Sequence, residues 1–324
     1  MTKGKWLIVY IGIIAMALFL VACNNGEETE EDDATEFLTM LTGGTSGTYY
    51  PLGGEMATII KNETGIQTDA LSSNASADNV VALQNEEAEL AFVQTDVVAF
   101  AVEGTNAFED NPVKNVQAIG ALYPETIQIV TTKNTGIDSV EDLQGKTVSV
   151  GAPGSGTYIN AEQILEIHGM TMDDIETQHL DFGESTSGIQ DGNIDAAFIT
   201  AGTPTGAVEG LGASVDISIV PIEEDKIEAL VEKYPYYAKD TILGGTYGGL
   251  DQDITTVAVG AMLAVTDSLS EDVVYDITKA IYENADSISH SKGAFITKEN
   301  GALGIGIDFH PGAEKYFKEV GVLE

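Results

Sequence analysis

Glycine and hydroxyl side chains gather in two segments of the chain, each placed just before an expected helix. The first, residues 42–50, reads TGGTSGTYY; it follows an alternating apolar pattern typical of a strand and precedes a helical pattern that begins near Leu52. Such a loop leaves the N–H groups of the first helical turn free to meet an anion. The chemistry that these residues offer is therefore the binding of a ligand.

The second segment, residues 151–158, reads GAPGSGTY and stands between a strand-like run at 148–150 and a helical pattern that reaches Leu165. It contains the same tripeptide, Gly-Thr-Tyr, 109 residues further along the chain. The tripeptide alone could recur by chance, so the residues around it decide what the repeat means.

A strand-like run also recurs with the loop. Residues 195–200 repeat the pattern of residues 89–94 at an offset of 106. In each copy a polar cluster lies between the loop and the strand, at 72–79 and 183–188. The nearly constant offsets predict two similar lobes, which suits a length of 324 residues.

Strands and helices alternate through both copies, which predicts an α/β fold with a largely parallel sheet. Further strands are expected at 116–122 and, after Tyr123 and Pro124, at 127–131, the latter crossing between lobes. The remaining expected elements are a helix at 225–234, a loop rich in tyrosine and glycine at 236–249, a strand at 257–265 and a helix from Ser270 that completes the first lobe.

Ligands of open parallel sheets bind beyond the carboxyl ends of the strands. If the two lobes face each other, the loops after their strands converge on one cleft. The residues expected to line that cleft are Thr45, Ser46, Gly47, Thr48, Tyr49, Ser73, Asn74, Gln94, Thr95, Asp96, Ser155, Gly156, Thr157, Tyr158, Thr200, Ala201, Gly202 and Thr203.

Two enzyme motifs are matched only in part. Residues 145–147, GKT, resemble the end of a phosphate-binding loop, but Val140 stands where that loop needs a glycine. Around Ser155 the chain resembles a nucleophile elbow, but Thr157 stands where the second glycine is required. Because both motifs fail on spacing, we expect no enzyme activity.

Metal ligands are not paired at the usual spacings. The four histidines are expected at helix ends or in loops, with solvated or capping roles; they are His168, His179, His290 and His310. Residues 251–262 begin like a calcium loop, but Thr256 replaces its glycine and Met262 its last acidic ligand. We expect neither a metal nor a cofactor.

The start of the chain predicts export. Lys3 and Lys5 precede an apolar run at 6–22, which is typical of a secretory signal peptide. Cys23, the single cysteine, follows Leu-Val-Ala as in a bacterial lipobox, which implies cleavage before it and a lipid anchor on the outer face of the cell membrane. An ordinary buried cysteine is the alternative. The largely acidic residues 24–36 are typical of a tether.

The charge of the chain limits its partners. Its 14 basic and 52 acidic residues give a formal net charge of −38, which argues against nucleic acid as a partner. All the basic residues are lysines. Without arginine, a ligand carboxylate must be held by helix N-termini and by hydroxyl or amide donors, an inventory that suits a small anion or zwitterion.

Several motifs together resemble the TAXI group (TRAP-associated extracytoplasmic immunogenic proteins), the solute-binding components of tripartite ATP-independent periplasmic (TRAP) transporters. The resemblance covers the chain from about Phe37 to its end. It is carried by residues 42–54 (TGGTSGTYYPLGG), by Ser73, Asn74 and Asn79, by 91–96 (AFVQTD), by 142–146 (DLQGK), by 154–157 (GSGT) and by 195–198 (DAAF).

The resemblance implies a type II periplasmic-binding-protein fold, in which two α/β lobes joined by two crossing strands close on a solute. Lobe I would comprise residues 37–126 and 258–324, and lobe II residues 127–257. The residues that would face the solute by this resemblance are 45–49, Asn74, Gln94, Asp96, 155–157 and 201–203. In related proteins that solute is glutamate, glutamine or a dicarboxylate such as 2-oxoglutarate. The loaded receptor would then dock on a TRAP permease in the membrane.

Two other functions share parts of this pattern. A substrate-binding lipoprotein of an ABC importer would have the same fold and anchor, and neighbouring genes would separate it from a TRAP receptor. Some enzymes of precursor synthesis also have type II folds; a cysteine or histidine in the cleft would favour one, and the expected cleft residues include neither.

Overall fold

The structure is a computed structural model that describes residues 37–324. These residues belong to one compact unit. The expected signal peptide, the lipidation site at Cys23 and the acidic tether lie outside the described residues. Within the described residues, no helix combines the length and the apolar character needed to cross a membrane.

Three parallel strands form the sheet of the first lobe: β1 (Phe37–Leu41), β2 (Gln67–Leu71) and β3 (Leu90–Gln94). β1 lies between β2 and β3. Successive side chains of β3 alternate between two separate cores, with Phe92 in one and Val93 in the other. Because a strand turns successive side chains to opposite faces, both faces of this sheet are buried.

The second lobe repeats this arrangement with β5 (Thr147–Ser149), β6 (Glu176–Gln178) and β7 (Ala196–Ala201). β5 lies between β6 and β7 and is parallel to both. The strand-like runs that recur in the sequence are thus β3 and β7, which occupy the same position in the two lobes. The expectation of two similar α/β lobes is confirmed.

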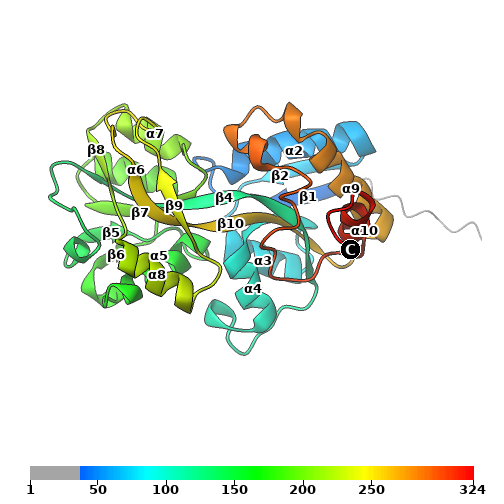
Figure 1. Ribbon diagram of the computed structural model, residues 1–324, viewed down its shortest axis with the longest axis horizontal. Helices are drawn as coiled ribbons and strands as arrows, with labels where there is room; N and C mark the ends of the chain where they lie inside the picture. Colours follow the sequence, from blue (N-terminus) through cyan, green and yellow to red (C-terminus); the bar gives the residue numbers. More distant parts are fainter. Residues whose placement is uncertain (1–36) are drawn as a thin grey trace, which may run out of the picture. The chain divides into compact units, whose positions relative to one another are not determined.

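Two long antiparallel strands, β4 (Val116–Thr132) and β10 (Ile254–Thr266), run through both lobes (Figure 1). β10 pairs with β3 in the first lobe, and β4 pairs with β7 in the second. The sheet is therefore mixed rather than largely parallel. The sequence suggested a break at Tyr123 and Pro124, but Pro124 lies within the ladder opposite Gly260. Proline is tolerated here because β4 pairs with β7 only from Thr126 onward, so that this part of β4 has a partner on one side alone, and because a bulge lies close by.

Two further strands extend these long ones. β8 (Ile217–Val220) pairs with β4, and β9 (Ala238–Ile242) pairs with β10. β9 lies inside the tyrosine- and glycine-rich segment that was expected to be a loop. Most of its residues are exposed or half-buried, so its sequence lacks the apolar alternation that predicts a strand. Its backbone is held in strand conformation by pairing with β10.

Helices cover both faces of the sheet in each lobe (Figure 1). The described α-helices are α2 (Tyr49–Thr64), α3 (Ser76–Gln84), α4 (Thr95–Glu103), α5 (Gly156–Ile167), α6 (Phe182–Gln190), α7 (Gly206–Gly212), α8 (Glu224–Lys233), α9 (Glu271–Glu283) and α10 (Pro311–Glu319). In the first lobe α2, α9 and α10 share one core, and α3 and α4 share the other. In the second, α5 and α8 share one core, and α6 and α7 share the other.

Short 3-10 helices complete the fold: η1 (Asn106–Phe108), η2 (Glu141–Leu143), η3 (Met172–Asp174), η4 (Ala285–Ser287) and η5 (Ser291–Phe295).

Along each of the long strands β4 and β10, the side chains pass from a core of the first lobe to a core of the second. Tyr123 packs in a core of the first lobe and Ile127 in one of the second, while Ala261 and Val259 divide in the same way on β10. The lobe boundaries expected from the sequence stay a prediction, drawn within a few residues of these points.

Candidate functional site

A small cavity lies between the two lobes, beside the carboxyl ends of β1, β3 and β7. Its volume is about 50 Å³, taken as the space open to the centre of a water molecule. A single water needs about 10–15 Å³ on this measure. The cavity therefore has room for a small solute or a few waters, and a larger ligand would require the lobes to move apart.

Eleven of the expected cleft residues line this cavity, and they come from both lobes: Gly47, Thr48, Tyr49, Ser73, Asn74, Gln94, Ser155, Gly156, Thr157, Thr200 and Ala201. The fold thus brings together loops that are more than a hundred residues apart in the sequence. That each of these residues contacts a solute stays a prediction.

The other expected residues lie outside the cavity. Thr45 and Ser46 border a second, outer cavity, Thr95 lines an apolar cavity beside β4 and β10, and Tyr158 lines one next to η3. Asp96 is buried beneath the site. Gly202 packs against Lys292, and the hydroxyl of Thr203 lies 3.4 Å from that of Thr126.

Four helices begin at the cavity: α2, α3, α5 and α6. At the start of α2, Thr48 occupies the N-cap position without a capping hydrogen bond, and Ala75 does so at the start of α3. At the start of α5, the Ser155 hydroxyl accepts a hydrogen bond from the N–H of Tyr158 at 3.3 Å, and at the start of α6 the carboxylate of Asp181 is the cap. Because the N-terminal end of a helix carries partial positive charge, the ends of α2 and α5 favour an anion in the cavity, whereas the first N–H groups of α3 already donate to a carbonyl of the other lobe.

Direct hydrogen bonds join the lobes around the cavity. The N–H groups of Ala77 and Asp78, at the start of α3, donate to the carbonyl of Gly154 at 3.0 and 3.1 Å. On the other side, the N–H of Ala207 donates to the carbonyl of Ser46 at 3.2 Å. The lobes are therefore closed on each other in this conformation.

A buried carboxyl group, that of Glu125 in β4, borders the cavity. The hydroxyl of Tyr49 donates to its Oε2 at 2.8 Å, and that of Tyr123 lies 3.5 Å from its Oε1. Burial raises the pKa of Glu125 to about 8, although the hydrogen bond from Tyr49 lowers it. A positively charged group of a ligand would favour the ionised form of this carboxyl.

A second buried carboxyl, that of Asp96, links the lobes below the cavity. The side-chain amide of Asn160 in α5 donates to its Oδ2 at 3.0 Å. Burial raises the pKa of Asp96 to about 6, against hydrogen bonds from the Val97 N–H and from Asn160. Its Oδ1 has no hydrogen-bond partner among the described residues. Asp96 therefore acts between the lobes rather than on the cavity surface.

Several residues of the site were missed by sequence reasoning. Gly43, Gly44, Ala75, Ser76, Glu125, Ala152, Asp181 and Phe182 also line the cavity. Glu125 had one signal, because it is the single acidic residue of β4.

Lys292 in η5 had no such signal. Its side chain is buried and packs closely against Gly202. A Cβ added to Gly202 would lie 2.7 Å from Cε of Lys292. Burial lowers the pKa of Lys292, against the charges of Asp240 and Glu125.

The histidines partly follow the expectation. His290 and His310 cap η5 and α10, accepting hydrogen bonds from the N–H groups of Lys292 and Gly312. His168 ends α5, but its side chain is buried rather than solvated. It lies beside Glu141 and Glu223, and this is the one group of three metal-ligating side chains found among residues 37–324. Sequence spacing could not reveal it, because its members come from three separate segments.

Solved structures share the fold of this chain at low sequence identity. One from Bordetella bronchiseptica RB50 has a TM-score of 0.53 at 17% identity, over 88% of this chain and 82% of that one. A structure described as a periplasmic transporter has a TM-score of 0.53 at 14% identity, over 89% and 93%. The substrate-binding protein of an amino acid ABC transporter has a TM-score of 0.47 at 13% identity, over 80% and 97%.

The expected fold class, two α/β lobes of the periplasmic-binding-protein type, is confirmed. These comparisons do not show membership of the TAXI group. A sequence model of the NMT1-like family matches residues 40–321, nearly the whole described region. The chain therefore belongs to the NMT1-like family.

Proposed function

We propose that the protein is an extracytoplasmic solute-binding receptor, which captures a small solute between its lobes and delivers it to a membrane transporter. One observation carries this proposal: a small cavity between two closed lobes, lined by hydroxyl and amide side chains from both, at which four helices begin. The family and the two-lobed fold support it.

Capture would work through closure. A solute that touches only one lobe stabilises the open and closed forms equally, whereas a solute that bridges both lobes favours the closed form. The hydrogen bonds from Ala77 and Asp78 to Gly154 form only when the lobes meet. Solute and lobe–lobe contacts would therefore stabilise the same state.

The charges of the site favour a zwitterion. The starts of α2 and α5 suit a carboxylate, and the buried carboxyl of Glu125 suits an ammonium group. An amino acid such as glutamate or glutamine carries both groups, whereas 2-oxoglutarate lacks the ammonium. We place the amino acids before the dicarboxylate for this reason.

The proposal also concerns the class of membrane transporter that receives the solute. The TRAP-specific form has no support from the comparisons, and the binding lipoprotein of an ABC importer fits them better. At a TM-score of 0.47, the likeness to an amino acid ABC transporter's binding protein does not decide between the two. A gene for a multi-span permease beside this one, without an ATPase gene, would favour TRAP; an ATPase gene would favour the ABC importer.

The anchor and the lack of catalysis belong to the same proposal. A lipid on Cys23 would hold the receptor at the outer face of the cell membrane. Neither cysteine nor histidine is among the residues that line the cavity, which supports a binding role rather than an enzymatic one.

A thermal-shift panel tests the function. Glutamate, glutamine, 2-oxoglutarate and unrelated solutes are added to the protein, and a ligand at 100 times its Kd should stabilise it by about 2.7 kcal/mol. Asn74→Ala should weaken the effect of the true ligand, while Asn85→Ala, at the exposed far end of α3, should not. If all the acids leave the melting temperature unchanged while an unrelated solute raises it, the proposed solute class is wrong.

A further inference from the structure

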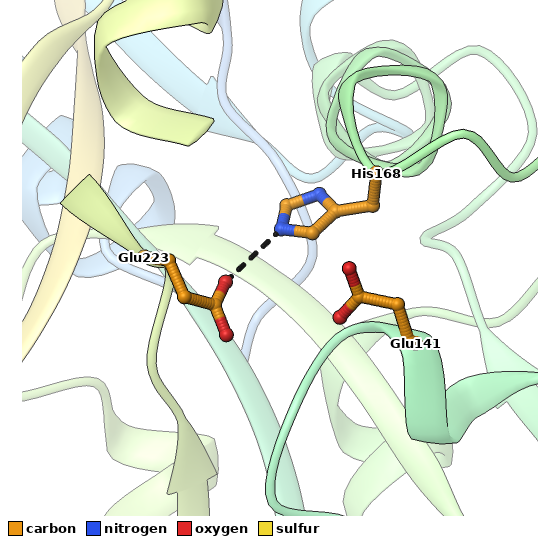
Figure 2. Close-up of side chains that lie close together, drawn as sticks. All are labelled: Glu141, His168 and Glu223. Atoms are coloured by element: carbon orange, nitrogen blue, oxygen red, sulfur yellow. Dashed lines mark hydrogen bonds and ion pairs between the residues drawn. The ribbon is translucent and has the colours of Figure 1, made fainter. Parts of the chain in front are cut away.

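Three side chains that can bind a metal meet in the second lobe, away from the residues that line the cavity (Figure 2). Glu141 belongs to η2, His168 follows α5, and Glu223 precedes α8. Their ligand atoms all lie within 4.8 Å of one another. Figure 2 shows the two carboxylates turned toward the imidazole ring.

The hydrogen bond on the inner side of the His168 ring fixes its hydrogen. Nδ1 lies 2.7 Å from the carbonyl oxygen of Ile164, which can only accept, so Nδ1 carries the hydrogen. In the neutral ring, Nε2 then presents a bare lone pair. The side chain of His168 is 1% exposed, so water does not replace the missing partner.

The atom that faces this lone pair is another acceptor. Nε2 of His168 lies 3.3 Å from Oε2 of Glu223, and the carboxylate of Glu141 stands beside them. Two acceptors at this distance repel each other unless a cation lies between or beside them. That cation is either a proton on the ring or a metal ion.

The two carboxylates beside the ring suit a divalent ion, whose charge balances both. No lysine forms an ion pair with Glu141 or Glu223 among the described residues. The ammonium of Lys226 in α8 donates instead to the carbonyl of Ile167 at 3.3 Å, and Lys233 and Lys239 pair with other glutamates.

One pair of ligand atoms has the spacing of a zinc site, and Glu141 lies within 4.8 Å of both. Ligands about 2.1 Å from a tetrahedral zinc ion lie about 3.4 Å apart, and the distance from Nε2 to Oε2 is 3.3 Å. A hydrogen bond from the other ring nitrogen to a backbone carbonyl is the usual support of a metal-binding histidine. An imidazole ligand suits zinc, whereas calcium and magnesium prefer sites made of oxygen atoms alone.

We propose that Glu141, His168 and Glu223 bind a zinc ion, with water in the fourth position. The ion ties η2 and the start of α8 to the end of α5, and so stabilises the second lobe without touching the solute. This site is independent of the proposed receptor function.

Calorimetric titration with zinc tests the proposal on the full chain after treatment with a chelator. Excess magnesium is present so that the acidic surface does not bind zinc unspecifically. Glu141→Gln and Glu223→Gln each remove one ligand at an exposed position, so that the fold is kept, and Glu228→Gln on α8 is the matched control. Cobalt is the second probe, because its visible absorption reports tetrahedral coordination.

One zinc ion should bind per chain in the unaltered protein and in Glu228→Gln. Its affinity should fall by more than about tenfold in Glu141→Gln and in Glu223→Gln, and the cobalt absorption should be lost with it. Equal affinity in all four proteins would place zinc elsewhere, and no saturable binding would leave a proton as the cation; either result overturns the proposal. Stabilisation by solute should be the same in all four proteins, whatever the zinc result.

Discussion

The helices α2 and α5 begin with the same Gly-Thr-Tyr tripeptide but use it differently. In α5 the glycine, Gly156, is already the first helical residue, and Ser155 before it caps the helix with its own hydroxyl. The positive end of α5 is therefore partly satisfied from within the second lobe.

In α2 the helix begins at the tyrosine, Tyr49, and the threonine before it has no capping role. The hydroxyl of Thr48 instead donates to the carbonyl of Gly202 in the other lobe at 3.4 Å. Tyr49 points its own hydroxyl at Glu125. The first copy of the tripeptide therefore makes side-chain hydrogen bonds to the other lobe and to the buried carboxyl, whereas the second packs against the first lobe and its helix is capped from within its own lobe.

This difference shows what a sequence repeat can and cannot specify. The repeat places both tripeptides at the start of a helix beside the cavity. The role of each side chain depends on what lies opposite when the lobes close, and that is different on the two sides.

The largest effect is expected from the glycine of the second tripeptide. A Cβ on Gly156 would lie 2.1 Å from Oε1 of Gln94 in the first lobe, whereas a Cβ on Gly47 would lie 3.3 Å from the ring of Phe182. Overpacking of this kind costs about 1–3 kcal/mol, or about 5- to 150-fold in affinity. Gly156→Ala should weaken solute binding within this range, as measured by calorimetry.

Gly47→Ala is the control for that measurement, because its added methyl group needs only a small shift of the Phe182 ring, so solute binding should change much less. Small-angle scattering should also show Gly156→Ala in a more open form at saturating solute. If both variants bind solute as the unaltered protein does, the closed lobes do not form the binding state.

The largest effect on stability, as distinct from solute binding, is expected from the buried carboxyl that only the first tripeptide contacts. The pKa of Glu125 is about 8 in the folded protein against 4.5 for an ordinary glutamate. As pH rises from about 4.5 to 8, the unfolded chain releases this proton while the folded protein keeps it, so the stability of the solute-free protein should fall. The loss should total on the order of a few kcal/mol and level off above pH 8.

Glu125→Gln removes this titration and should flatten the dependence of unfolding free energy on pH, as measured with denaturant. Asp96, whose pKa of about 6 acts in the same direction at lower pH, is present in both proteins and cancels. The exposed Glu228→Gln should leave the slope unchanged. If the unfolding free energies of Glu125→Gln and of the unaltered protein change with pH in parallel, Glu125 is ionised in the folded state and the prediction is wrong.

The smallest effect is expected from the two capping positions. Ser155→Ala removes a helix cap and should cost about 1 kcal/mol of stability. Thr48→Ala removes no cap and should cost less, while weakening solute binding through the lost bond to Gly202. Ser270→Ala, which uncaps α9 away from the cavity, should cost as much stability as Ser155→Ala without changing solute binding. Equal stability losses for Thr48→Ala and Ser155→Ala would contradict the difference between the two helices.

Much of the fold could be predicted from local patterns. The strands β3 and β7 and the helices after the two loops follow from short stretches of sequence whose apolar spacing decides their form. Where the local signal was weak or misleading, prediction failed: Pro124 suggested a break in β4, and the polar residues of β9 suggested a loop. In both cases pairing with β10 outweighed local propensity.

The sequence by itself determined which loops carry glycine and hydroxyl groups, that arginine takes no part, and that two lobes share one plan. Only the tertiary structure decided which titratable groups meet. Glu125 meets Tyr49 across 76 residues, and His168 meets Glu223 across 55. Burial and charge pairing depend on segments far apart in the chain, and no local pattern records which of them will meet.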